Sequence, residues 1–112
     1  MKYFKYIFNE DEWTIYLISD TDDVVTDLDT AAEVKFIERE IYFRVSSVVL
    51  EVICHELWHV YFSYCYLSDT NNMDLHDIEE VSANLFADKG QRIFDTAKVI
   101  LQRLQDMKKG KD

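Results

Sequence analysis

The fold is decided by residues 48–66, which read VVLEVICHELWHVYFSYCY. One stripe of side chains recurs there at spacings of three and four, the period of an α-helix: Val48, Val52, His55, His59, Phe62 and Tyr66. The other faces of this helix are largely apolar as well, so we expect it to be the buried central element of its domain. Histidines in such a helix require partners.

Upstream of this helix the chain favours strands. Residues 13–19 are rich in β-branched and aromatic types, which predicts a strand. Residues 3–8 fit either a second strand or part of a short helix. Residues 20–30 carry five aspartates and little periodicity, which indicates an exposed loop.

A hairpin is expected immediately before the central helix. Residues 33–38 and 40–45 both alternate between apolar and polar positions, which predicts an antiparallel pair that turns at Glu38-Arg39-Glu40. Ser46 or Ser47 could then cap the central helix.

Downstream, the pattern predicts two more helices. Asp74 is a suitable N-cap for a helix from about Leu75 to Lys89, which Gly90 would end. A last amphipathic helix is expected from about Arg92 to Met107.

Charge and composition exclude several classes of protein. The formal net charge is −10, which argues against direct nucleic-acid binding because phosphate contacts require clustered lysine and arginine. The most apolar stretch, 48–67, contains charged residues and histidines and is therefore a poor membrane span. Cys54 and Cys65 lie about 16 Å apart along one predicted helix, too far for a disulfide. We expect both to be reduced and the protein to be cytoplasmic.

His55, Glu56 and His59 carry the clearest chemical signal. On a helix the two histidines project to the same side, about 40° apart around the axis, and can direct ring nitrogens at one metal ion. Glu56 lies at the edge of that face, where it can reach a water molecule bound to the metal. His-Glu-x-x-His on a helix is the zinc motif of metalloproteases. The alternative is a histidine pair satisfied by hydrogen bonds, with Glu56 exposed.

A catalytic zinc site needs a third protein ligand and one open position. No further histidine of the metzincin pattern follows His59, so the ligand must come from elsewhere, and the next helix offers Asp77, Glu79 and Glu80. Glu80 is favoured because it belongs to a polar stripe that could face the histidine helix: Asp77, Glu80, Asn84 and Asp88.

Support for that ligand could come from Asn84, one turn beyond Glu80. Its side chain could accept a hydrogen bond from the nitrogen that His55 or His59 does not use for the metal. Glu79 and His76 are weaker candidates for the third ligand. The competing interpretation of the stripe is a solvated acidic face.

The sequences HELWH at 55–59 and EVSANLFA at 80–87 together resemble the ImmA/IrrE family of gluzincin metallopeptidases. That family shows a His-Glu-x-x-His helix and then a Glu-x-x-Ala-Asn-x-Phe-Ala segment. The resemblance covers roughly residues 40–90 and implies zinc bound by His55, His59 and Glu80, with Glu56 as the general base. The family includes peptidases that cleave helix-turn-helix repressors of mobile elements, so it implies a repressor as a candidate substrate.

We therefore expect one α+β, minimal zincin-like domain over residues 1–112. Its small antiparallel or mixed sheet of about three strands would pack on the central helix, with two further helices. The expected function is zinc-dependent hydrolysis of a peptide bond in a protein, such as a phage or mobile-element regulator. One alternative is a catalytically inactive zinc-binding interaction module, for example a phage-encoded inhibitor. The other is a metal-free helical interaction module.

Overall fold

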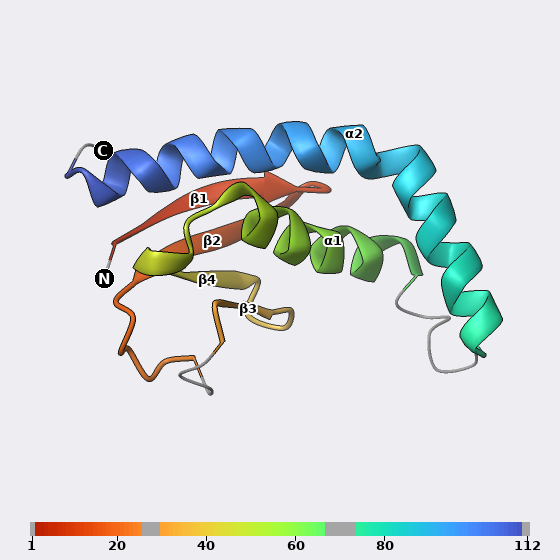
Figure 1. The fold of residues 1–112 in the computed structure, drawn as a ribbon, viewed down its shortest axis with the longest axis horizontal. Helices are drawn as coiled ribbons and strands as arrows, with labels where there is room; N and C mark the ends of the chain where they lie inside the picture. The colour runs from red at the N-terminus through yellow and green to blue at the C-terminus, as the bar shows by residue number, and fades with distance from the viewer. Residues whose placement is uncertain (1, 26–29, 67–73, 111–112) are drawn as a thin grey trace.

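The computed structural model describes residues 2–25, 30–66 and 74–110. Four strands come first and two helices follow, as Figure 1 shows. A short 3-10 helix at Val45–Ser47 separates the two groups. The elements are β1 (Lys2–Phe8), β2 (Asp11–Ile18), β3 (Ala32–Lys35), β4 (Glu40–Arg44), α1 (Leu50–Tyr66) and α2 (Leu75–Lys108).

The strands form one mixed sheet in the order β1-β2-β4-β3. The α+β class was expected, and a mixed sheet was one of the two expected arrangements, but the sheet has four strands rather than about three. Residues 3–8, which the sequence left undecided, belong to strand β1. Asn9 and Glu10 join β1 to β2 with φ values of 50° and 70°, the two positive φ angles that a tight hairpin turn with right-handed strand twist requires.

The predicted hairpin before α1 is present as β3 and β4, which pair antiparallel from Ala32↔Phe43 to Lys35↔Glu40. Residues 36–39 make the turn, and Arg39 adopts a φ of 56°. Strand β4 also pairs in parallel with β2, from Thr14↔Glu40 to Ile18↔Arg44. Strand β3 is consequently the edge strand beside α1.

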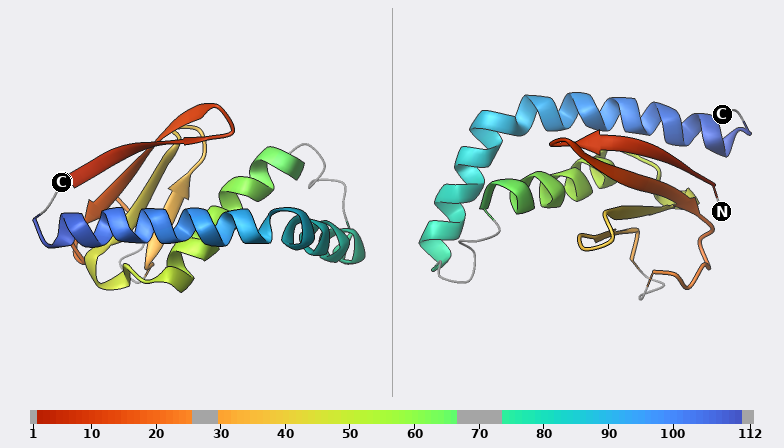
Figure 2. Two further views of the ribbon diagram at one scale, coloured as in Figure 1. Left: turned by 90° about the horizontal axis from the view of Figure 1, so that it is seen from above. Right: turned by 180° about the vertical axis from the view of Figure 1, so that it is seen from behind.

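Both helices pack on one face of the sheet. The core there combines alternate side chains of the strands, such as Trp13, Ile15, Ile41 and Phe43, with the inner faces of the helices: Ile53, Leu57, Val60, Ile93, Ala97, Ile100 and Leu104. Figures 1 and 2 show the C-terminal part of α2 running alongside the β1–β2 hairpin. Burial of these side chains in one continuous cluster stabilises the arrangement of all six elements.

Helix α1 departs from the sequence prediction at its start and on one face. It begins at Leu50, because Ser46 and Ser47 belong to the preceding 3-10 helix rather than capping α1. It is also not buried all round, since His55 and His59 are exposed. His55 lies two positions from both Ile53 and Leu57, about 200° around the axis from the side that faces the core.

The prediction of two separate C-terminal helices was wrong, because residues 75–108 form the single helix α2. Asp74 is the N-cap as expected, and its side chain accepts a hydrogen bond from the backbone N–H of Asp77 in a capping box. The helix then continues for 34 residues, through Gly90, to Lys108. Gly90 does not end it: no positive φ occurs there, and a buried apolar residue lies on each side of the glycine, Leu85 before it and Ile93 after it. Figure 1 shows instead that the helix axis bends between its teal and blue parts.

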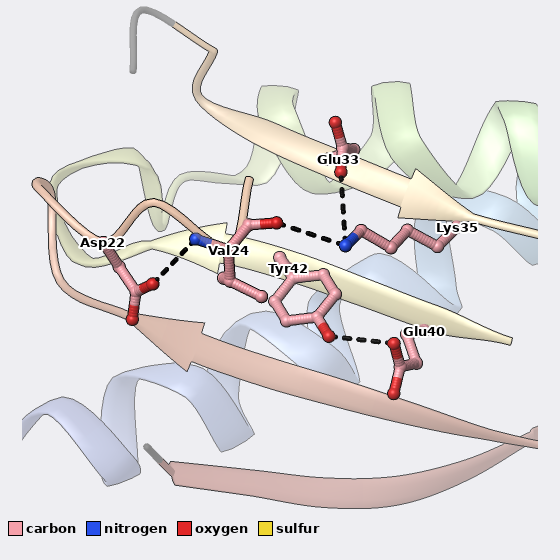
Figure 3. Close-up of polar contacts among 6 residues, drawn as sticks. All are labelled: Asp22, Val24, Glu33, Lys35, Glu40 and Tyr42. Atoms are coloured by element: carbon pink, nitrogen blue, oxygen red, sulfur yellow. Dashed lines mark hydrogen bonds and ion pairs between the residues drawn. The ribbon is translucent and has the colours of Figure 1, made fainter. Parts of the chain in front are cut away.

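The loop after β2 covers part of the opposite face of the sheet. Val25 packs there against Ile18 and Tyr42 in a second small core. Figure 3 shows Lys35 reaching from β3 to the backbone carbonyl oxygen of Val24, at 3.1 Å, and to Glu33. This part of the predicted exposed loop is therefore fixed to the sheet. Within the described ranges, neither helix has the length and apolar character needed to cross a membrane.

Candidate metal centre

The two histidines lie side by side on the exposed face of α1. The Nε2 atoms of His55 and His59 are 3.2 Å apart, and their rings meet edge to face with centroids 4.9 Å apart. Two nitrogen ligands at the usual zinc distance, with tetrahedral angles, lie about 3.3 Å from each other. The pair is therefore spaced as two ligands of one zinc ion would be. The same distance also allows one ring nitrogen to donate a hydrogen bond to the other.

Glu56 lies between this pair and the protein interior. Only 8% of its surface is exposed, whereas the hydrogen-bonded alternative predicted an exposed glutamate. Burial raises the pKa of its carboxyl group, the positive charge of His55 opposes that shift, and Glu33 adds to it. A carboxyl group with a raised pKa is suited to take up and release a proton near neutral pH.

The surroundings of His59 favour its neutral ring. Burial lowers the pKa of His59, and the nearby charge of His55 lowers it further. Two imidazolium ions would repel each other at this distance. A neutral imidazole is the form that binds a metal ion.

A groove of about 370 Å³ opens beside His55 and Glu56. One wall is the first half of α1, and the other is the chain that leads into the edge strand β3. The lining residues are Thr30, Ala31, Ala32, Glu51, Val52, His55 and Glu56. The groove thus places the carboxyl group of Glu56 and the ring of His55 next to a strand edge.

Arg44 at the end of β4 holds the outer wall of this groove in place. It is only 3% exposed, and its Nε donates to the carbonyl oxygen of Thr30 at 2.8 Å. Its Nη1 donates to the carbonyl oxygens of Ser19, Asp20 and Asp22 at 3.0–3.1 Å. Arg44 was not among the predicted site residues, and no local pattern identifies it, because these four carbonyl groups lie 14 to 25 positions away in the chain.

The structure does not bring the predicted third ligand to the histidines. The side chain of Glu80 is exposed, as are those of Asp77, Asn84 and Asp88. Leu85, about 100° around the helix axis from Asn84, is buried. Among the described residues, no three His, Cys, Asp or Glu side chains gather as a metal site. Asn84 likewise makes no hydrogen bond to either histidine. The acidic stripe therefore has the arrangement of a solvated face.

Three further residues of the two helices lie outside the centre. The Tyr64 hydroxyl accepts a hydrogen bond from Trp13 Nε1 at 2.7 Å and donates to Asp11 at 2.8 Å, which makes it a bridge between α1 and β2. Cys54 is a free, half-buried thiol whose pKa is raised by burial, as expected of a small apolar residue. His76 is exposed near the start of α2.

Comparisons of the chain with family models, curated proteins and solved structures found no match. The resemblance to the ImmA/IrrE family accordingly rests on the residues of the two motifs.

Proposed function

We propose that this protein is a zinc-dependent peptidase whose metal ion is held by His55 and His59. The observation that carries the proposal is the 3.2 Å separation of the two Nε2 atoms next to a buried glutamate. A catalytic zinc ion has three protein ligands, and the two histidines would supply two of them. Glu80 stays the proposed third ligand, on the strength of the motif, and α2 would have to present it to the pair.

Glu56 is the proposed general base. A zinc ion held by His55 and His59 would supply a water of lowered pKa and would polarise a substrate carbonyl. The raised pKa of Glu56 suits it to accept a proton from such a water and to hand it to the leaving amine. Glu56 is largely shielded from solvent and lines the groove beside His55, where a substrate would be bound.

A protein or peptide is the proposed substrate, and a repressor of a phage or mobile element is the candidate that the resemblance implies. Strand β3 lies at the edge of the sheet and leads directly into the groove. An extended peptide can add to such an edge through backbone hydrogen bonds. That pairing would draw the peptide past Glu56 without requiring a particular sequence.

A second candidate function is a zinc-binding interaction module without catalysis, such as an inhibitor protein. The observation that favours it is the exposure of Glu80 and the absence of a gathered third ligand among the described residues. Two imidazoles on one helix can share a zinc ion with ligands supplied by a partner protein. In that case Glu56 would be dispensable for the biological effect.

The test compares wild-type protein with Glu56→Gln, and uses Glu51→Gln as the matched control. Glu51 lies five residues earlier on α1 and also lines the groove, but it is exposed. Cells producing each form would be profiled for newly created protein N-termini by mass spectrometry, and the zinc content of each purified protein would be measured. We expect new termini with wild type and Glu51→Gln, and a loss of at least about 100-fold with Glu56→Gln at unchanged zinc content. If all three proteins give identical sets of protein N-termini, the peptidase proposal is overturned and the interaction module is favoured.

A further inference from the structure

A second cleft lies on the far side of α1 from the histidines. It has a volume of about 440 Å³ and is formed where the β1–β2 hairpin, α1 and α2 meet. Its lining residues are Tyr6, Ile7, Phe8, Asn9, Tyr61, Lys89, Arg92 and Thr96, none of which lines the groove at Glu56. Tyr61 is two positions after His59, about 200° around the helix axis.

The charge of this cleft is opposite to that of the molecule. The chain has 22 acidic and 12 basic residues, yet two basic residues and no acidic residue line the cleft. Lys89 and Arg92 are one helical turn apart on α2, so both can point at the same ligand. Neither forms a hydrogen bond, ion pair or ring contact with any residue in the described ranges. Two cations left without a counter-charge in a concave site attract an anion.

Neutral donors and apolar surface complete the cleft. The hydroxyl groups of Tyr6, Tyr61 and Thr96 make no hydrogen bond with the described part of the chain, so they are available to a ligand. The ring of Phe8 contacts the rings of Tyr6 and Tyr61, with centroids 5.0 and 6.2 Å away. The buried Phe8 thereby holds the two tyrosines as a wall against which a flat ring can pack.

We propose that this cleft binds a small phosphate monoester carried on a flat ring, of the nucleoside monophosphate class. A phosphate monoester carries about −1.5 to −2 charges at pH 7, which matches two cations better than a single carboxylate does. Arginine adds a planar fork that fits phosphate oxygens. The size of the cleft falls within the range of about 300–1,000 Å³ that is typical of small-molecule sites. The overall charge of −10 opposes binding of a nucleic-acid chain in the same place.

The experiment is isothermal titration of the full chain with AMP at low salt, with adenosine and inorganic phosphate titrated in parallel. We expect AMP to saturate one site with a dissociation constant below about 1 mM. Phosphate should bind at least about fivefold more weakly, because it lacks a ring to stack. Adenosine should show no binding at the same concentrations. Failure of AMP to saturate, or equal binding of AMP and adenosine, would overturn the proposal.

Two variants and a control test whether AMP binds in this cleft. Lys89→Gln/Arg92→Gln should weaken AMP binding at least about tenfold. Arg92→Gln alone changes an exposed side chain and provides a second test if the double variant unfolds. The control is Lys98→Gln, which removes another cation of α2 that lies over the Phe94 ring and outside the cleft. Undiminished AMP binding by the Arg92 and double variants, or an equal loss in the control, would contradict the assignment.

Discussion

At the scale of single residues, Arg44 controls the shape of the proposed zinc groove. Its guanidinium group is buried and donates to four backbone carbonyl oxygens of the loop between β2 and β3. We predict that Arg44→Met lowers the free energy of unfolding by about 2–4 kcal/mol, because four backbone carbonyl groups lose their hydrogen bonds to a buried charged donor. Urea denaturation measures this loss.

The control for that prediction is Arg39→Met. Arg39 is half exposed and forms a surface ion pair with Asp11 at 3.4 Å. Such pairs contribute about 0–1 kcal/mol. A cost for Arg44→Met no larger than that of the control would show that the loop does not depend on Arg44.

Tyr42 should make the protein sensitive to alkaline pH. Burial raises the pKa of its hydroxyl, and the hydrogen bond that it donates to Glu40 at 2.8 Å raises it further (Figure 3). The unfolded chain therefore loses this proton at a lower pH than the folded one. The resulting stability is complete below the unfolded pKa of about 10 and is lost as the pH rises beyond it.

Urea denaturation between pH 8 and 11 tests this claim about Tyr42. We expect the free energy of unfolding to fall more steeply with pH in wild type than in Tyr42→Phe. Parallel curves for the two proteins would rule out a role for this hydroxyl.

The sequence predicts the features of single residues only where the contacting residues are close together in the chain. The approach of His55 to His59 follows from the helical period alone, and the structure reproduces it. The burial of Glu56 and the role of Arg44 depend on loop and strand residues far away in the chain. The spacing of residues within the motif therefore does not predict these distant contacts.

At the scale of secondary structure, Gly90 offers a direct test of how α2 is built. A Cβ at this position would lie 3.6 Å from Phe86 Cδ2, an ordinary contact. We predict that Gly90→Ala raises the free energy of unfolding by about 0.5–1 kcal/mol, because alanine loses less conformational freedom in a helix.

Gly110 is the matched control for that substitution. Its φ of 79° lies in the left-handed region, so Gly110→Ala should cost about 1 kcal/mol. Urea denaturation of both variants measures the change in the free energy of unfolding, which we expect to be a gain for Gly90→Ala and a loss for Gly110→Ala. A loss of stability in Gly90→Ala would indicate that the bend of α2 requires the glycine.

Only some boundaries of the secondary-structure elements could be predicted from the sequence. The capping box at Asp74 was predictable, because it needs only Asp74 and Asp77. The continuation through Gly90 was not, because burial of Leu85 before the glycine and of Ile93 after it outweighs the low helix propensity of one glycine. The side of α2 that faces α1 was also decided by packing: Leu85 is buried, and the acidic stripe with Glu80 is exposed.

At the scale of the whole molecule, the proposed zinc site depends on how the two helices are placed. Helix α1 supplies two ligands without help from the rest of the fold. A third ligand from α2 requires the acidic side of its N-terminal part to turn toward α1. Because zinc binds the folded chain, a completed site would also stabilise the fold by about 2.7 kcal/mol when free zinc is 100 times its dissociation constant.

The most direct test of the zinc proposal is the metal content of protein purified without a histidine tag, measured by inductively coupled plasma mass spectrometry. We predict about one zinc per chain in wild type and in His76→Asn, which removes the only other histidine. His55→Asn/His59→Asn should lose it, and Glu80→Gln should bind it at least about tenfold more weakly. Zinc well below one per chain in wild type, or zinc that persists in the double variant, would contradict the account.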